Sequence, residues 1–205
     1  FNDNTVLLEA GTILTKSYIK RLQDMGITDI YIEDDISKGL VVRHVVSEAT
    51  RQEAIAFVKK SMDNFASIEL ISSKEVIEIV SKILDEILTL DDIIVNLMDI
   101  KTCDSYTFAH CVNVCILSII TGLKLKLNNE QLKELGIGAL LHDIGKIMIP
   151  TDILLKKSAL STQEYDNIKQ HTIYGYNIIK KLPNINETSA RVALEHHERF
   201  NGKGY

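Results

Sequence analysis

The chain has 205 residues, of which 45% are hydrophobic and 25% charged, a composition typical of a globular protein that can bury a real core. The net charge of -5 offers no basic stripe for a nucleic-acid backbone, so extended DNA or RNA is not expected as a partner. The longest apolar run, residues 111–123, is shorter than the roughly 20 residues that cross a bilayer. Neither a membrane span nor a signal peptide is visible.

The first 46 residues predict a small α+β module. Residues 5–8 and 27–32 are strand-like, and residues 15–25 have the pattern of an amphipathic helix closed by Gly26. None of these residues suggests catalysis. We expect a regulatory or interaction role, and a plain packing role is the alternative.

From Ser47 onward the pattern is helical throughout. Helices are predicted over residues 47–66, from Ser72 with Glu75 as a capping box, and over residues 91–100. We expect residues 47–100 to be linker helices that transmit a signal or form a homodimer contact.

A third region, residues 101–205, predicts four more helices. One covers residues 105–123 and a second residues 130–143, a third opens at Ser161 with Glu164 as its capping box, and a fourth opens near Asn186. Gly145 and Pro150 end the second helix in a loop. The fold is therefore predicted to be mainly α, a helical bundle preceded by linker helices and the α+β module.

Cysteine usage indicates a reducing compartment. The chain has three cysteines without metal-type spacing. Cys111 and Cys115 are four residues apart in an apolar helical pattern, which predicts buried free thiols and fits a cytoplasmic location.

Five of the six histidines fall between residues 110 and 205. Taken singly, His110 and His171 share helical faces with apolar residues and can equally be hydrogen-bonded core histidines. His142-Asp143 offers more, because the imidazole can bind one metal ion while the carboxylate oxygens bridge to a second. Two metals about 3.5–4 Å apart can clamp a phosphate and hold the hydroxide that attacks phosphorus. Lys146, one turn on, can neutralise a phosphate oxygen.

A second group of candidates lies at the end of the chain. His196 and His197 point about 100° apart on a helix, so both reach one site only if that helix end faces the cavity. Gly202 and Gly204 flank Lys203, which allows a tight turn with exposed backbone amides suited to phosphate. An ordinary turn is the alternative, and the preceding histidines favour the functional interpretation.

These motifs occur in a recognisable order: His110, the run from His142 to Lys146, His171, the His196-His197 pair, and the turn from Gly202 to Tyr205. In this order, over about residues 100–205, the chain resembles the HD-GYP family of cyclic di-GMP phosphodiesterases. The resemblance implies an HD-type helical bundle that holds two or three iron or manganese ions. It also implies hydrolysis of cyclic di-GMP to the linear dinucleotide pGpG, to GMP, or to both.

The resemblance also implies roles for single residues. Asp143 would bridge two metals, and His110, His142, His171, His196 and His197 would be terminal ligands. Lys146 would hold phosphate beside Asp143 in catalysis, and Arg199, Lys203 and Tyr205 would form the substrate-binding loop.

Two departures from the family pattern refine this expectation. Family members with three metals carry a glutamate one turn before the first histidine, where this chain has Tyr106, so two divalent metal ions are expected. The family's last aspartate ligand lies beyond the signature loop and outside these 205 residues. The domain is therefore expected to be C-terminally incomplete, as part of a longer protein.

Two other functions remain open at this stage. An HD phosphohydrolase could act on another nucleotide, although the turn from Gly202 to Tyr205 argues against this. A catalytically inactive module could bind a nucleotide or a partner protein, although five convergent histidines argue against that.

Overall fold

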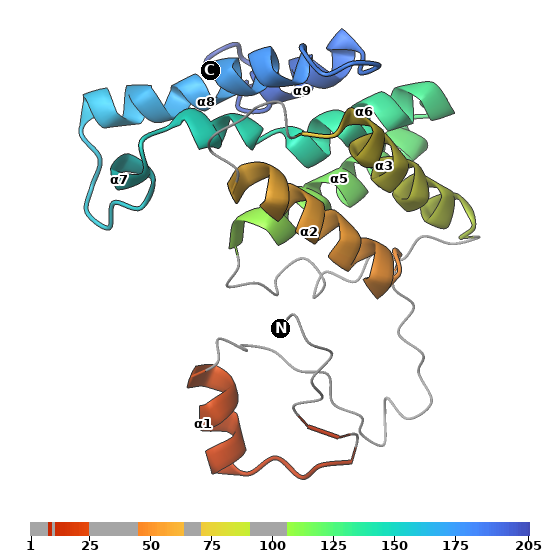
Figure 1. Ribbon diagram of the computed structural model, residues 1–205, viewed down its shortest axis with the longest axis vertical. Helices are drawn as coiled ribbons and strands as arrows, with labels where there is room; N and C mark the ends of the chain where they lie inside the picture. Colours follow the sequence, from red (N-terminus) through yellow and green to blue (C-terminus); the bar gives the residue numbers. More distant parts are fainter. Residues whose placement is uncertain (1–7, 10, 25–44, 64–70, 91–105) are drawn as a thin grey trace.

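The computed structural model describes residues 8–9, 11–24, 45–63, 71–90 and 106–205, and the regular secondary structure within these ranges is helical (Figure 1). The elements are α1 (Lys16–Asp24), α2 (Glu48–Asp63), α3 (Ser73–Leu88), α5 (Tyr106–Lys124), α6 (Asn129–Leu141), the 3-10 helix η2 (Ile144–Met148), α7 (Thr151–Leu154), α8 (Thr162–Ile179) and α9 (Glu187–Glu195). This confirms the predicted mainly α fold with a helical bundle.

Parts of the sequence-based prediction fall outside the described ranges. The strand expected over residues 27–32, the helix expected over residues 91–100 and nearly all of the strand expected over residues 5–8 lie there. The same holds for Gly26. The N-terminal α+β module therefore stays a prediction, of which α1 is the described part.

The predicted helix starts are set by local capping. Ser161 accepts a hydrogen bond from the Glu164 amide, and the Glu164 side chain accepts one from the Ser161 amide, which is the expected capping box. Ser72 likewise accepts from the Glu75 amide at 3.1 Å, while the Glu75 carboxylate faces Lys60 of α2 at 3.4 Å. These caps satisfy backbone amides that would otherwise lack partners at a helix start.

The second helix of the C-terminal region ends earlier than predicted. α6 stops at Leu141, and the chain enters η2 through Asp143, whose backbone has φ -95° and ψ 3°. The Lys146 amide donates to the Asp143 carbonyl at 3.0 Å, a 3-10 type bond that tightens the turn. As a result His142 and Asp143 lie at a sharp change of direction, and both side chains are buried.

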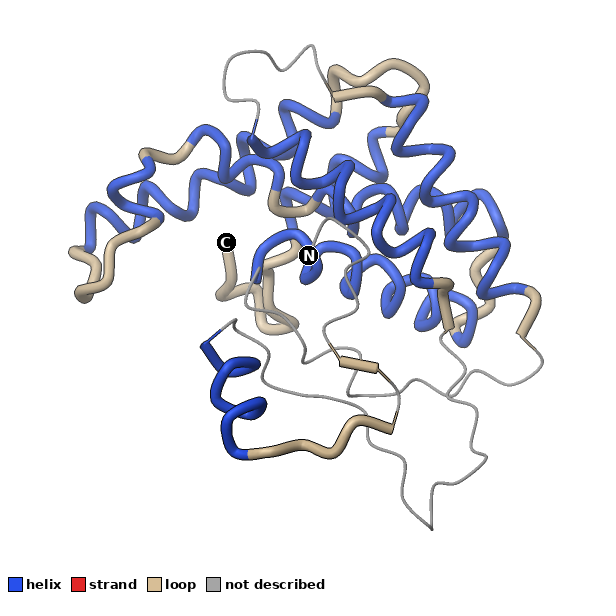
Figure 2. The backbone as a smooth tube through the Cα atoms, turned by 60° about the horizontal axis from the view of Figure 1, so that its bottom comes forward, coloured by secondary structure: helices blue, strands red, loops and turns tan. Residues whose placement is uncertain are grey.

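The bundle is centred on α5 and α6, which pack along each other (Figure 1). Figure 2 shows the helices of the bundle as blue tubes, with the described loops between them in tan. α2 and α3 pack on one side of the α5–α6 pair, while α9 packs on α6 and α8 packs on both α9 and η2. All seven of these elements contribute to one hydrophobic cluster, whose fully buried members include Val80, Ile83, Ile119, Leu132 and Leu140. Burying one such Leu or Ile side chain stabilises the fold by roughly 1.5–3 kcal/mol. The bundle around α5 and α6 therefore depends on α2 and α3.

The two cysteines of α5 are buried free thiols, as predicted. Burial raises the pKa of Cys111 to about 12 and also raises the pKa of Cys115. Both thiols therefore stay protonated and act as small apolar groups. Among the described helices, none is long and apolar enough to cross a membrane.

Gly145 allows η2 to lie directly against α8. A Cβ atom at this position would overlap the backbone of His171 and Gly175, so the two elements touch through main-chain atoms. Because Asp143 and Lys146 flank Gly145, this contact also sets their position relative to His171.

We expect Gly145→Ala to lower the free energy of unfolding by about 1–3 kcal/mol, the usual range for overpacking a tight site. Urea unfolding followed by far-ultraviolet circular dichroism measures the change. Gly122→Ala is the matched control, because its Cβ would meet only the ends of leucine side chains such as Leu132 Cδ2 at 2.7 Å. Equal losses in the two variants would contradict the backbone contact.

Candidate metal centre

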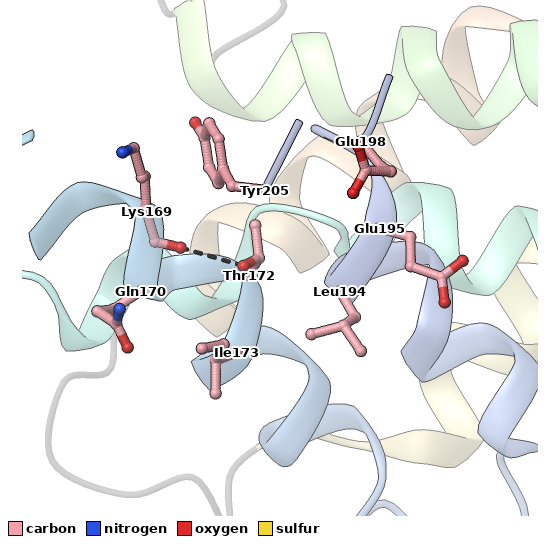
Figure 3. A pocket seen from close by; sticks show the side chains of 8 residues that line it. All are labelled: Lys169, Gln170, Thr172, Ile173, Leu194, Glu195, Glu198 and Tyr205. Atoms are coloured by element: carbon pink, nitrogen blue, oxygen red, sulfur yellow. Dashed lines mark hydrogen bonds between the residues drawn. The ribbon is translucent and has the colours of Figure 1, made fainter. Parts of the chain in front are cut away.

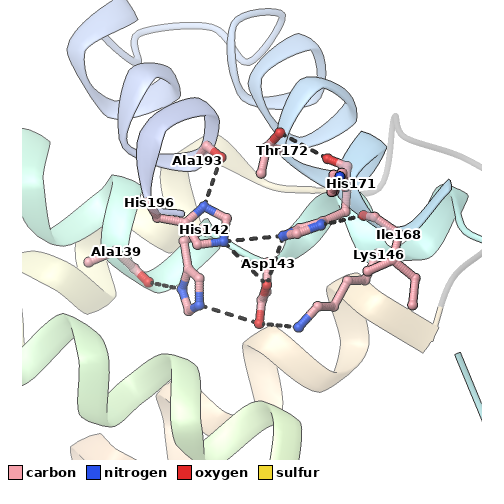
Figure 4. Close-up of polar contacts among 10 residues, drawn as sticks. Ala139, His142, Asp143, Lys146, Ile168, His171, Thr172, Ala193 and His196 are labelled. Carbon is pink, nitrogen blue, oxygen red and sulfur yellow. Dashed lines mark hydrogen bonds and ion pairs between the residues drawn. The ribbon is translucent and has the colours of Figure 1, made fainter. Parts of the chain in front are cut away.

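Five histidines and one aspartate from four segments converge on one site. Figure 4 shows four of these residues, His142, Asp143, His171 and His196, pointing toward one another. His110 comes from α5, His142 and Asp143 from the turn between α6 and η2, His171 from α8, and His196 and His197 from the end of α9. They form two groups in which the ligand atoms lie within 4.8 Å of one another: His110, His142 and Asp143, and His171, His196 and His197. The structure thus brings together all six predicted ligand residues. His44 lies outside the described residues.

The Asp143 carboxylate stands between the two groups. Its Oδ2 lies 3.3 Å from His142 Nε2 and 2.7 Å from Lys146 Nζ. Its Oδ1 lies 3.5 Å from His171 Nε2 and 3.8 Å from His196 Nε2. Because each oxygen faces a different set of nitrogens, this carboxylate has the geometry of a bridging ligand.

Backbone carbonyls orient three of the imidazole rings. The Nδ1 atoms of His142, His171 and His196 lie 2.8, 2.6 and 2.8 Å from carbonyl oxygens three residues earlier in the chain. A carbonyl oxygen can only accept, so each Nδ1 carries the proton and donates it. In the neutral ring the Nε2 lone pair then points into the site, as a metal ligand requires.

Burial keeps four of the site's imidazole rings neutral. It lowers the pKa of His196 to about 4, and it also lowers the pKa values of His110, His171 and His197. At neutral pH these imidazoles therefore offer lone pairs rather than positive charges. This is the protonation state in which histidine binds a metal.

Asp143 is buried but remains ionised. Burial alone would raise its pKa, but the contacts with the neighbouring His142 and the Lys146 ammonium outweigh burial and hold the pKa well below the usual range. Only 3% of Asp143 is exposed, so its negative charge is concentrated where the histidine nitrogens meet. A buried carboxylate of this kind is stabilised only by compensating positive charge.

The donor set fits divalent metal ions. The Nε2 atoms of His171 and His196 lie 3.2 Å apart, and two lone pairs at this distance repel unless a proton or a cation lies between them. Imidazole nitrogen with carboxylate oxygen suits iron, manganese or zinc and is too rich in nitrogen for magnesium or calcium. Each of the two groups could therefore hold a transition metal, with Asp143 shared between them.

The glycine turn after the histidine pair is fastened by Glu198. Its Oε1 accepts hydrogen bonds from the amides of Arg199 and Gly204, each at 2.7 Å. Gly202 has φ 66°, a conformation that favours glycine, and a Cβ at Gly204 would overlap the backbone of His197 and Glu198. The tight turn predicted from the two glycines is confirmed.

The side chains of this turn differ in their placement. Arg199 and Lys203 are exposed. Tyr205 instead stacks on His197, with ring centroids 4.7 Å apart and planes at 19°. It also meets the edge of His171 at 6.4 Å. Tyr205 thus lies against two candidate ligands, whereas sequence reasoning gave it only a substrate contact and gave Glu198 no role.

A surface pocket of about 410 Å³ adjoins this corner of the site (Figure 3). It lies between α8 and α9 and is lined by Lys169, Gln170, Thr172, Ile173, Leu194, Glu195, Glu198 and Tyr205. The Lys169 ammonium is paired with Asp166 at 2.8 Å, so the two glutamates dominate the charge of the lining. Such a lining disfavours phosphate, which leaves the Lys146 side of the site as the better place for an anionic group.

The C-terminal half of the chain is similar to a known protein family and to several characterised proteins. The HD domain family matches residues 106–205. A cyclic di-GMP phosphodiesterase of Pseudomonas aeruginosa is 34% identical over 128 residues, which are 62% of this chain and 31% of that protein. A cyclic di-GMP phosphodiesterase of Thermotoga maritima is 39% identical over 103 residues, 50% of this chain and 28% of that protein.

A related group acts on a different cyclic dinucleotide. The 3'3'-cGAMP-specific phosphodiesterase 1 of Vibrio cholerae is 31% identical over 130 residues, 59% of this chain and 27% of that protein. The chain spans less than a third of the length of each of these three relatives.

The histidines predict a pH dependence of stability in protein stripped of metal with a chelator. Unfolding returns His196 from a pKa of about 4 to its ordinary value of 6.5. Between these values the unfolded chain binds more protons than the folded one, so the free energy of unfolding should fall as the pH falls from 6.5 towards 4. Urea unfolding in a chelator at pH 7.5 and pH 5 measures this, and His196→Gln should show a smaller drop. An identical drop in that variant would contradict the assignment.

The Tyr205 stack predicts a measurable effect on His197. Tyr205→Leu should lower metal affinity several-fold, because an aromatic pair contributes about 0.5–1.5 kcal/mol beyond its buried area. Tyr205→Phe retains the ring and should bind metal as the wild type does. Isothermal titration with Mn²⁺ compares the three proteins, and equal affinities for the leucine and phenylalanine variants would show that the stack is unimportant.

Proposed function

Because residues 106–205 belong to the HD-GYP branch of the HD domain family, we propose that the protein hydrolyses cyclic di-GMP to pGpG, to GMP, or to both. The observation that carries the proposal is the Asp143 carboxylate, with one oxygen facing His142 and Lys146 and the other facing His171 and His196. A carboxylate shared between two ligand groups is the arrangement expected of a two-metal phosphodiesterase.

Two divalent ions, iron or manganese, are the proposed cofactors. His110 and His142 would hold one, His171, His196 and His197 would hold the other, and Asp143 would bind both. When bound, such ions polarise the phosphate and provide a nucleophile at neutral pH.

The protein's own groups would orient the substrate. The Lys146 ammonium is partly exposed, with 31% of its side chain accessible, and lies 2.7 Å from Asp143. It can therefore turn from Asp143 to a phosphate oxygen without unfolding any part of the site. Asp143 would keep its negative charge throughout, since its pKa is held well below the usual range, and would not act as a proton donor. Arg199 and Lys203, both exposed on the Gly202 turn, are the proposed further contacts for the anionic substrate.

A second candidate substrate is 3'3'-cGAMP, because some relatives are named for that activity. The two dinucleotides share the phosphodiester ring and differ in one base, so the metal centre alone does not separate them. Cleavage of 3'3'-cGAMP with cyclic di-GMP left intact would assign the protein to this second activity.

The remaining parts of the chain receive more general roles. Residues 1–46 are the proposed regulatory or interaction module, and residues 47–100 the proposed linker helices and homodimer contact. A second-messenger substrate is consistent with a cytoplasmic location.

The central test is Asp143→Asn in the full-length protein. Loss of an outer partner of a metal ligand typically lowers affinity or activity about 10–100-fold. Removing the bridging charge should therefore lower both bound metal and turnover by more than about 100-fold while helical content survives. Elemental analysis of anaerobically purified protein and chromatography of the products measure these changes.

Asp166→Asn is the matched control, because Asp166 lies on the same bundle but pairs with Lys169 at the surface. It should retain metal and activity. Retained hydrolysis in Asp143→Asn would refute the proposed role of Asp143. Tight cyclic di-GMP binding without turnover in metal-loaded wild-type protein would instead favour an inactive binding module.

A further inference from the structure

Helix α2 precedes the HD domain match in the sequence but lies against the metal centre in space. It packs on α5, which carries His110, and on η2, which carries Lys146 (Figure 1). Its inner face is held by buried side chains, among them Ala54, Phe57 and Val58. Helix α2 is thus firmly packed beside α5 and η2, two elements that carry residues of the site.

One polar contact joins α2 to the helix of His110. Arg51 Nη1 donates to Asn113 Oδ1 at 2.5 Å. Asn113 is only 8% exposed and lies three residues after His110 on α5, a spacing that puts both side chains on one face of the helix. The Arg51 guanidinium is therefore hydrogen-bonded to α5 one turn away from His110, a candidate metal ligand.

The start of α2 is itself anchored, so Arg51 reaches Asn113 from a fixed base. Glu86 of α3 accepts hydrogen bonds from the Ser47 amide and from Thr50 Oγ1, each at 2.5 Å. Although burial would raise the pKa of Glu86, these bonds outweigh it and hold the pKa below its ordinary value. The carboxylate therefore stays charged and locks the first turn of α2 to α3.

His110 is the candidate ligand that most needs such support. Its side chain is exposed, whereas His142, Asp143 and His171 are buried and confined by packing. His197 is exposed as well, but its ring stacks on Tyr205. Among the six ligands His110 is also the one that α5 contributes. Metal ligands must be held to within roughly 0.5 Å and 10–20°, so a small rotation of α5 would displace His110 from the others.

We propose that Arg51 is a positioning residue for the metal centre, which fixes α5 through Asn113 and so holds His110 in place beside His142 and Asp143. The inference rests on the proposed two-metal function. It adds that the centre depends on a residue outside residues 106–205. Loss of Arg51 should affect the metal that His110 binds and leave the metal of His171, His196 and His197 in place.

The test is titration of the full-length, metal-stripped protein with Co²⁺, followed by the visible absorption of the bound ion. Arg51→Met keeps the aliphatic stem and removes the guanidinium. It should weaken one of two binding steps about tenfold, as loss of an outer partner of a ligand typically does, and leave the other step unchanged. His110→Ala identifies the affected step.

Two further variants separate positioning from general stability. Lys82→Met removes the Lys82–Glu53 ion pair, 2.6 Å long, which also ties α2 to α3 but does not reach α5. It should bind Co²⁺ as the wild type does. Arg51→Lys retains a cationic donor for Asn113, and it should recover most of the affinity lost in Arg51→Met.

The outcomes distinguish this inference from the function on which it rests. Two unchanged binding steps in Arg51→Met, or an equal weakening of both, would overturn the positioning role alone. If Arg51→Met does not fold, Arg51→Lys and Asn113→Ala decide: an Asn113→Ala protein with both steps intact also overturns it. Wild-type protein that binds no divalent metal would overturn the proposed function and this inference together.

Discussion

A buried negative charge that needs partners organises the C-terminal half of this protein. Asp143 is almost completely enclosed, and an enclosed carboxylate without compensation destabilises a fold by several kcal/mol. The Lys146 ammonium, one turn on, supplies a positive charge 2.7 Å from the carboxylate, and the imidazole nitrogens of His142, His171 and His196 surround it from separate segments. The packing of η2 on α8 and of α9 on α8 brings those groups within reach. The same helix contacts therefore stabilise the bundle and supply the polar partners of the buried Asp143 carboxylate.

Local patterns explain how much could be predicted from the sequence. The cap at Ser161 and the turn around Gly202 depend on neighbouring residues, and both were predicted correctly. The six candidate ligands were identified by their order along the chain, and their convergence follows from the bundle. Gly145 and Pro150 correctly predicted that this helix ends near Asp143, although α6 already stops at Leu141. The 3-10 turn that follows was not predicted, because the close contact of Gly145 with α8 joins residues far apart in the sequence.

Contacts between distant residues were beyond sequence reasoning. Nothing near Arg51 or Asn113 in the sequence indicates that they meet, because they are 62 residues apart. Glu198 was missed although its bonds to the Arg199 and Gly204 amides are local, because an exposed glutamate beside a turn is usually solvated. The shared hydrophobic cluster is a further example of distant contacts, since α2 and α3, predicted to be linker helices, complete the core around α5 and α6.

The carbonyl groups that orient His142, His171 and His196 belong to Ala139, Ile168 and Ala193. In many metal sites the groups behind the ligands are side chains, which a single mutation can remove. Here they are main-chain atoms, which every amino acid supplies. The orientation of these three rings therefore tolerates substitutions at residues 139, 168 and 193, as long as the helix backbones stay in place. The substitutions that would disturb these rings are therefore those of the histidines themselves and of the glycines that let the helices meet.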